Sequence, residues 1–234
     1  MKLEVGYRNS FEVRQEVYHC RVPREISILY LSDLHLNAFS GGLILGLQKK
    51  IHELDPSIIL LGGDYVDTEK GVEHFDSLLN SMSGKNVFAI AGNHDRIFGI
   101  SRLEKIIKSK KVVWLEGESV ALNVNACKIQ ISNRVAHPHQ TKADVNILCL
   151  HEPLNMDKLD NSFNLVFAGH LHGCQFVFWK NLKGLYPGRF FYKMNFLRRR
   201  VNRCLYLISK GLGDTLPLRY NCKKDVIYVR IRQF

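Results

Sequence analysis

The sequence predicts an α/β fold with a largely parallel sheet in its first half and a second sheet in its second half. Three observations predict it. The 234 residues are 46% hydrophobic and 24% charged, which is an ordinary composition for a globular protein. Short apolar runs alternate with amphipathic segments over the first 117 residues, and strand-like segments dominate the remainder. Alternating strands and helices favour parallel strands with helices packed on them.

The first half contains four predicted strands separated by helices. Leu43, Leu47 and Ile51 recur at helical spacing, and the apolar run SIILL at 57–61 has the length of a buried strand. The predicted strands are 26–31, 57–61, 86–91 and 112–114, and the predicted helices are 42–54, 72–82 and 100–107. This order predicts that the strands run parallel.

The second half reads as strands. Residues 119–124 and 128–132 predict a hairpin that turns around Asn125. Further strands are expected at 146–150, 164–168, 204–208 and 226–231. We find no repeat, low-complexity tract or linker, so we expect a single domain over residues 1–234 with two sheets.

Composition also argues against several classes of protein. No apolar run reaches the roughly 18 residues of a membrane span, and the N-terminus lacks the apolar core of a signal peptide. The six cysteines form no CxxC pair, which argues against a disulfide framework and a cysteine zinc site. These features favour a reducing, cytoplasmic compartment.

The net charge of +11 is concentrated in the second half. Residues 1–117 carry 15 basic and 15 acidic residues, whereas residues 118–234 carry 18 and 7. An anionic partner is therefore expected, with three alternatives: nucleic acid, an anionic membrane surface or a phosphorylated substrate.

Five predicted strands each end in side chains that bind metals. The sequences after them are SDLH, GGDYVD, GNHD, HEP and GHLHG. Polar residues commonly begin loops, but that does not explain why Asp and His dominate here. The carboxyl ends of strands are where sites form in open α/β sheets, so the pattern predicts a metal site. Its candidate residues are Asp33, His35, Asp64, Asp67, Asn93, His94, Asp95, His151, His170 and His172.

The motifs D-x-H, G-D-x-x-D, G-N-H-D, H and G-H-x-H, in this order, resemble those of the calcineurin-like metallophosphoesterases. The segments LDPSIILLGGD, GHLHGCQ and KGLGDTLPLRYNC are also similar to the branch with YkuE-like and YaeI-like phosphodiesterases and UDP-2,3-diacylglucosamine pyrophosphatases. The resemblance implies a four-layer α-β-β-α sandwich, with two mixed sheets flanked by helices. Two departures are that Cys174 replaces a glycine and that the membrane segment of many relatives is lacking.

The resemblance implies a centre of two divalent metal ions. It places Asp64 as the bridging carboxylate, Asp33, His35 and His172 on one ion, and Asn93, His151 and His170 on the other. These oxygen and nitrogen ligands suit Mn²⁺, Fe or Zn²⁺, of which we expect Mn²⁺. The two cations would activate a water and neutralise charge on the phosphoryl oxygens.

Other polar residues have supporting roles in this hypothesis. His94 is expected to act as general acid or to hold a phosphoryl oxygen, with Asp95 orienting its ring. Asp67 is expected to be a hydrogen-bond partner within its own loop. The alternative for Asp95 and Asp67 is a helix N-cap or turn residue. His137 and His139, in AHPHQ, are expected on a surface loop because the ligand set is already complete.

The segment 176–207 mixes aromatic residues with eight Lys or Arg. It fits contact with an anionic membrane, nucleic-acid binding, or a solvated segment with one buried aromatic side. The resemblance favours lipid.

Together these features predict a bimetal-dependent hydrolase of a phosphodiester or pyrophosphate. The favoured substrate is UDP-2,3-diacylglucosamine, in lipid A precursor synthesis at the inner face of the membrane. The alternatives are a nuclease or nucleotide phosphodiesterase, and a scaffold of the same fold without catalysis.

Overall fold

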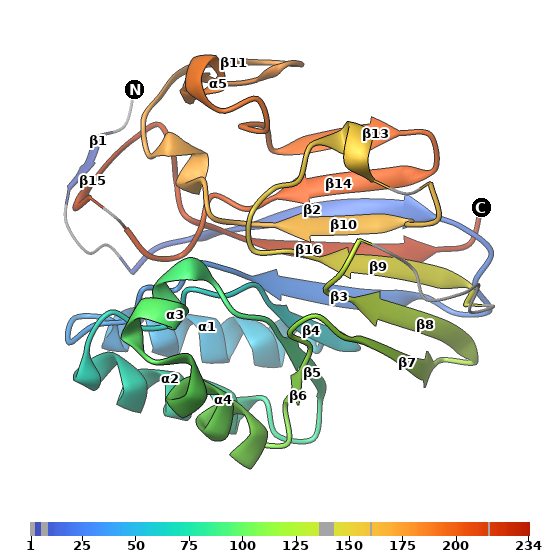
Figure 1. Ribbon diagram of the computed structural model, residues 1–234, viewed down its shortest axis with the longest axis horizontal. Coiled ribbons are helices and arrows are strands. Elements are labelled where there is room, and N and C mark those ends of the chain that lie inside the picture. Colours follow the sequence, from blue (N-terminus) through green and yellow to red (C-terminus); the bar gives the residue numbers. More distant parts are fainter. Residues whose placement is uncertain (1–2, 6–8, 136–142, 160, 215) are drawn as a thin grey trace.

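The computed structural model describes residues 3–5, 9–135, 143–159, 161–214 and 216–234, and in them two six-stranded sheets pack face to face (Figure 1). His137 and His139 lie outside the described residues. The fold class predicted from the sequence, an α/β fold with two mixed sheets and helices, is confirmed.

The first sheet has the strand order β2-β16-β3-β4-β5-β6. Its strands are β2 (Glu12–His19), β16 (Asp225–Arg232), β3 (Ile26–Leu31), β4 (Ile58–Leu61), β5 (Asn86–Ala89) and β6 (Val113–Trp114). The last four run parallel, as the strand-helix alternation predicts, and β16 is antiparallel to β3. The apolar run ISILYL forms β3, and every residue in it is buried.

Helices cover the outer face of this sheet. They are α1 (Gly41–Leu54), α2 (Glu69–Ser81) and α4 (Ile100–Ser109), and Figure 1 shows them on one side of the molecule. Their apolar faces pack with Leu29, Leu31 and Leu61 of the sheet in one buried cluster. The short helix α3 (Asn93–Phe98) follows β5.

The second sheet has the order β13-β14-β10-β9-β8-β7. Its strands are β13 (Arg198–Val201), β14 (Cys204–Ile208), β10 (Leu165–Ala168), β9 (Val145–Cys149), β8 (Cys127–Ser132) and β7 (Ser119–Val124). The four central strands are parallel and the edge strands antiparallel. Asn125 and Ala126, both with left-handed backbone, form the predicted turn between β7 and β8.

The inner faces of the two sheets share one core. Ile28 and Leu60 from the first sheet and Ile147 and Phe167 from the second are fully buried in it. The outer face of the second sheet packs against η1 (Met156–Lys158) and residues 194–196. Among the described residues, this side therefore has a thinner cover than the helical side.

Smaller elements lie beyond the sheets. The strands β11 (Val177–Asn181) and β12 (Gly184–Pro187) form a hairpin, which α5 (Gly188–Phe191) follows. The strands β1 (Leu3–Val5) and β15 (Leu218–Tyr220) pair with each other, and η2 (His172–Cys174) precedes the hairpin. No described helix is long and apolar enough to cross a membrane.

Candidate metal centre

The loops at the carboxyl ends of β3 and β4 are hydrogen-bonded to each other. Asp33 N–H donates to the Gly63 carbonyl at 3.0 Å, and His35 N–H donates to the Asp64 carbonyl at 3.0 Å. The loop after β10 joins them, because His170 N–H donates to Asp33 Oδ1 at 2.9 Å. Hydrogen bonds from backbone N–H groups thus hold together loops that are distant in sequence.

Five predicted ligands have left-handed backbone conformations. Asp33, His35, Asp64, His170 and His172 have φ values of 53°, 43°, 57°, 69° and 49°. For residues other than glycine this costs about 1–2 kcal/mol each. Such strain persists where the surrounding structure enforces it, and it concentrates at functional sites.

The first group of ligands comprises Asp33, His35 and His172. Their ligand atoms all lie within 4.8 Å of one another, and all three residues are buried. His172 Nε2 is 3.7 Å from Asp33 Oδ1. Burial lowers the pKa of His172 to about 4, which keeps its imidazole in the neutral form that binds metals.

His35 has a ring nitrogen that is free to bind a metal ion. Its Nδ1 is 2.8 Å from Asp67 Oδ1, and because a carboxylate accepts, the Nδ1 nitrogen carries the proton. Its Nε2 lone pair is therefore available, and this buried atom has no hydrogen-bond partner among the described residues. A buried polar atom without a partner is costly unless a ligand satisfies it. Asp67 was expected to bond within its own loop. It instead orients His35, which belongs to the loop after β3.

The second group comprises Asp64, His151 and His170, whose ligand atoms also lie within 4.8 Å of one another. Asn93 Oδ1 lies 2.9 Å from both His151 Nε2 and His170 Nδ1. His151 Nδ1 is 2.8 Å from the Gly62 carbonyl, which only accepts, so Nδ1 carries a proton and Nε2 is the ring nitrogen that faces the group. The four residues that were predicted to surround the second ion therefore converge on one point.

Asp64, a member of the second group, also lies close to the first. Its Oδ2 is 3.7 Å from His35 Nε2 and 3.2 Å from His151 Nε2. Burial disfavours its ionised form, but His151, His35 and the backbone N–H of His94 outweigh burial and lower its pKa to about 2. Conversely, burial disfavours the charged form of His151, yet Asp64 and Asp33 raise its pKa to about 9.

The donor set fits divalent cations. It consists of carboxylate and amide oxygens with imidazole nitrogens, without a thiolate, and this set suits Mn²⁺, Fe or Zn²⁺. The unpartnered Nε2 of His35 and the position of Asp64 between the groups are what two adjacent cations with a shared carboxylate would require.

The comparison with known proteins agrees with this geometry. The sequence profile described as calcineurin-like phosphoesterase matches residues 26–174, which include every predicted ligand. The chain belongs to the calcineurin-like phosphoesterase family. It is accordingly a metal-dependent hydrolase of phosphoester bonds, and the ions would be held by the two groups described above.

Two curated proteins resemble this calcineurin-like phosphoesterase over most of their length at low sequence identity. The uncharacterized metallophosphoesterase YkoQ of Bacillus subtilis is 23% identical over 89% of this chain and 84% of its own. The phosphodiesterase YaeI of Escherichia coli is 25% identical over 87% and 81%. Among solved structures, an archaeal phosphodiesterase is 14% identical with a TM-score of 0.45, covering 81% of this chain and 87% of its own.

His94 of this phosphoesterase lies beside the ligand groups. Its ring meets that of His35 edge-on at 4.7 Å, and their ligand atoms lie within 4.8 Å of Asp67. It also lines an open cleft of about 300 Å³, together with the apolar residues Val66, Ile97 and Phe98. A group bound in this cleft would face the imidazole of His94 and the predicted metal ligand His35.

Asp95 has a different role from the predicted one. Its carboxylate accepts from the backbone N–H groups of Asp64 at 2.7 Å, Tyr65 at 2.8 Å and Gly92 at 2.8 Å. Both oxygens are thus occupied by the backbone, and the residue is fully buried, so the expected orientation of the His94 ring by Asp95 is wrong. The alternative, a helix N-cap or turn residue, is closer, although the N-cap itself is Gly92: Asp95 is the third residue of α3, and its carboxylate accepts from the backbone N–H of Gly92.

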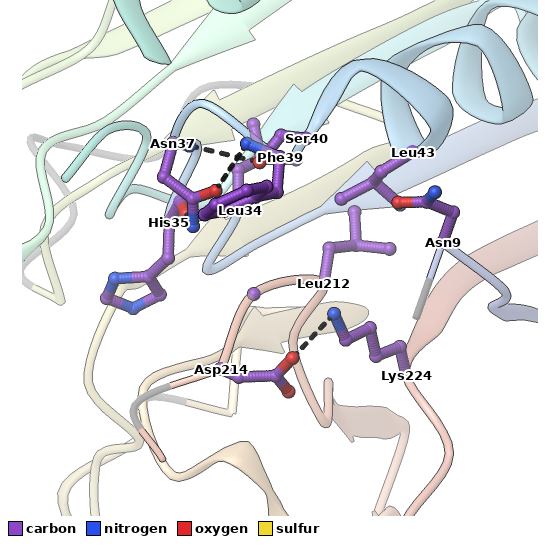
Figure 2. Close-up of a pocket in the computed structure, with 11 residues that line it drawn as sticks. Asn9, Leu34, His35, Asn37, Phe39, Ser40, Leu43, Leu212, Asp214 and Lys224 are labelled. Carbon is purple, nitrogen blue, oxygen red and sulfur yellow. Dashed lines mark hydrogen bonds and ion pairs between the residues drawn. The ribbon is translucent and has the colours of Figure 1, made fainter. Parts of the chain in front are cut away.

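Sequence reasoning did not place the segment after β14 in the site. Gly213 N–H donates to the Asp33 carbonyl at 2.5 Å, and a Cβ at Gly213 would lie 2.4 Å from His35 Cβ. Asp214 lines the same cleft as His94 and pairs with Arg219 at 2.5 Å and Lys224 at 2.7 Å. Figure 2 shows Asp214 and Lys224 facing the loop of His35 across a small pocket. The sequence did offer one indication, because the segment KGLGDTLPLRYNC resembles a segment of the relatives. No functional role was assigned to that segment.

Cys174 occupies a left-handed position, with φ 57°. The resemblance places a glycine there, and glycine adopts this conformation at no steric cost. The cysteine is accommodated in the turn that follows His172, at the cost expected for a side chain with positive φ.

Proposed function

We propose that this phosphoesterase hydrolyses a nucleoside diphosphate linked to an acylated sugar, namely UDP-2,3-diacylglucosamine, with Mn²⁺ as its metal. The observation that carries the two-metal chemistry is Asp64 Oδ2, which lies between His35 Nε2 at 3.7 Å and His151 Nε2 at 3.2 Å. In the proposed centre Asp33, His35 and His172 hold one ion, Asn93, His151 and His170 hold the other, and Asp64 holds both. The ions would supply an activated water and positive charge for the phosphoryl oxygens.

The residues of the chain supply the remaining roles. His94 faces the cleft and either donates a proton to the leaving oxygen or holds a phosphoryl oxygen. Asp67 keeps the proton of His35 on Nδ1, so that Nε2 points toward the centre. The backbone N–H of His94 donates to Asp64 Oδ1 at 2.8 Å and leaves Oδ2 for the ions.

Two observations support a substrate with an apolar part. The cleft beside His94 has an apolar wall of Val66, Ile97 and Phe98, and the Ile97 side chain is 83% exposed. Ile97 follows His94 by three residues on α3, so both lie on the same face of the helix. The name of the relative YaeI, a phosphodiesterase, supports a phosphodiester as the bond that is cleaved.

The proposed compartment is the reducing cytoplasm, which the sequence favours because its six cysteines are scattered and form no CxxC pair.

A nuclease or nucleotide phosphodiesterase is the second candidate. The charge of +11, with no acidic residue from 161 to 213, supports it, because nucleic acids bind basic surfaces.

UMP release from UDP-2,3-diacylglucosamine in mixed micelles tests the proposal. Chelated protein receives Mn²⁺, Fe²⁺ or Zn²⁺, and each reaction is repeated with excess chelator and with the Asp64→Asn variant. We expect chelator-sensitive UMP release by the wild-type protein, fastest with Mn²⁺, and none by the variant. If the protein cleaves an aryl phosphodiester but not this lipid, the lipid substrate is wrong, and cyclic nucleotides, DNA and RNA become the substrates to examine.

A further inference from the structure

The hairpin β11–β12 and α5 expose an unusual density of large apolar side chains. We define the hairpin surface as Phe178, Trp179, Leu182, Phe190, Phe191 and Tyr192, whose exposed fractions run from 48% for Trp179 to 99% for Leu182. The other exposed large apolar residues of the described chain, such as Leu45 and Ile97, are scattered over separate elements. Single exposed apolar residues are normal, but a group of this size within 15 residues marks an interaction surface.

The tip of the hairpin is held rigidly in its exposed position. Asn181 Oδ1 accepts from the backbone N–H groups of Lys183 at 2.8 Å and Gly184 at 3.3 Å. The Lys183 carbonyl in turn accepts from Arg189 Nε at 2.9 Å and from Arg199 at 3.1 Å. Leu182 therefore projects from an ordered turn, and little conformational entropy would be lost if a partner bound it.

The base of the hairpin is packed on the body of the protein. Val177 and Leu185 are buried together with Cys222, and Asn195 Nδ2 donates to the Leu185 carbonyl at 3.0 Å. A Cβ at Gly188 would lie 2.4 Å from Cys174 Sγ, so α5 rests on the turn that carries His172. The hairpin surface is thus attached firmly beside the metal centre.

Cations surround the apolar side chains. Lys180, Lys183 and Lys193 are exposed, and residues 161–213 contain no acidic residue that would neutralise them. Aromatic rings stack inside the surface, with Trp179 and Tyr186 at 5.1 Å and 5°. Aromatic and aliphatic groups flanked by lysines are typical of elements that lie in the interface of an anionic membrane.

The arginines of β13 do not belong to this surface. Arg198 pairs with Glu16 at 3.3 Å, Arg199 lies over the Phe196 ring at 4.5 Å, and Arg200 lies over Tyr18 at 5.7 Å. Similarly, every residue of β14 is buried. The sequence predicted one basic, aromatic element over residues 176–207, whereas in the structure its exposed large apolar residues, apart from Val201, lie within residues 178–192.

We propose that the hairpin surface docks this protein on anionic lipid membranes, with Leu182 and the flanking aromatic rings in the interface and the lysines on lipid phosphates. A second copy of the chain fits less well, because a symmetric contact would bring the same lysines together. Single-stranded nucleic acid also fits less well, because Leu182 offers nothing to a base or a phosphate, and one face of Trp179 is covered by Tyr186. The proposal does not depend on which phosphoester the centre cleaves.

Vesicle flotation of the full-length protein without substrate tests the proposal. The vesicles contain phosphatidylcholine with about one-third phosphatidylglycerol, or phosphatidylcholine alone. Leu182→Asp is compared with Leu45→Asp, which changes an exposed leucine (68%) of α1, on the opposite side of the molecule in Figure 1. Lys183→Glu is compared with Lys105→Glu, an exposed lysine of α4. Circular dichroism and thermal melting establish that all variants are folded.

We expect binding to the anionic vesicles that is at least tenfold weaker for Leu182→Asp and at least fivefold weaker for Lys183→Glu, with both control variants like the wild type. Equal binding by Leu182→Asp and Leu45→Asp would overturn the proposal. Absence of vesicle binding by the wild-type protein would also overturn it. In that case, a dimer in sedimentation that Leu182→Asp dissociates would indicate a second copy as the partner, and an oligonucleotide complex that Leu182→Asp abolishes would indicate nucleic acid.

Discussion

His94 is the residue whose chemical role is most open to a direct test. Its ring faces the cleft beside His35, and its side chain is not one of the proposed metal ligands. A general acid contributes most when the leaving group is a poor one, because that group needs the proton.

We therefore expect His94→Gln to lower kcat by about 10²–10⁴ for a diester with an alkyl leaving group, and by much less for a nitrophenyl diester. Steady-state kinetics on both substrates, with metal content measured in parallel, provide the comparison. Equal losses for the two leaving groups would contradict proton donation and favour a role in holding the phosphoryl oxygen.

Asp67 acts through His35. Its removal leaves the His35 Nδ1 proton without an acceptor, and loss of such a partner typically weakens metal affinity by about 10–100-fold. We expect Asp67→Ala to need that much more Mn²⁺ for half-maximal activity and to recover most activity in excess Mn²⁺. Glu73→Ala, which removes an exposed carboxylate of α2, is the control. A wild-type metal dependence for Asp67→Ala would refute the orienting role.

Asp95 is a structural residue in this account. Its buried carboxylate accepts three backbone N–H groups, and hydrogen bonds to a charged group contribute about 1.5–3 kcal/mol each. We expect Asp95→Asn to lower the free energy of unfolding of metal-free protein by about 3 kcal/mol or more, measured by urea denaturation. If stability is unchanged while kcat falls, Asp95 is a catalytic residue after all.

At the scale of elements, the loop after β14 is packed on the first metal loop. Gly213 has no room for a Cβ, which would lie 2.4 Å from His35 Cβ and 2.6 Å from the Leu34 carbonyl. We expect Gly213→Ala to displace one of the two loops and to reduce Mn²⁺ affinity at least tenfold, because His35 would move. Calorimetric titration with Mn²⁺ measures it. Gly41→Ala, whose Cβ would meet nothing closer than 3.5 Å, is the control, and equal affinities of the two variants would contradict the packing argument.

Elements with apolar runs could be predicted from the sequence, and those without could not. The runs ISILYL and CLYLI give β3 and β14 with the predicted bounds, because both are wholly buried. The strand β2 was missed because EVRQEVYH carries three charged residues and only two of its eight residues are buried. The hairpin β11–β12 was missed for a related reason, because its exposed face is apolar and its buried face is short, so no alternation appears.

The candidate site divides in the same way. Ligands such as Asp33 and His170 were predictable, because each directly follows a buried strand and parallel strands end at one edge. The hydrogen-bond partners of Asp95 could not be predicted, because the Asp95 side chain points away from the cleft and accepts from backbone N–H groups about 30 residues away in sequence. Nor could the position of Asp214, because it depends on how β14 and β16 bring distant loops beside β3.

At the scale of the whole molecule, the parallel strands of both sheets end at one place, and each sheet contributes some of the candidate ligands. Asp33, His35 and Asp64 come from the first sheet, whereas His151, His170 and His172 come from the second. The core between the sheets, with Ile28 and Phe167 fully buried, therefore fixes the geometry of the centre. Packing and catalysis are connected through this arrangement, because a shift between the sheets would separate the two halves of each ligand group.

The most direct test of the account is titration of chelated protein with Mn²⁺, following bound metal by mass spectrometry and hydrolysis of bis(p-nitrophenyl) phosphate on the same samples. We expect activity to appear as a second ion binds per chain, and we expect folded Asp64→Asn protein to be inactive at every Mn²⁺ concentration, because it lacks the shared carboxylate. Full activity in chelated protein, or normal turnover by Asp64→Asn, would contradict a two-metal centre built around Asp64.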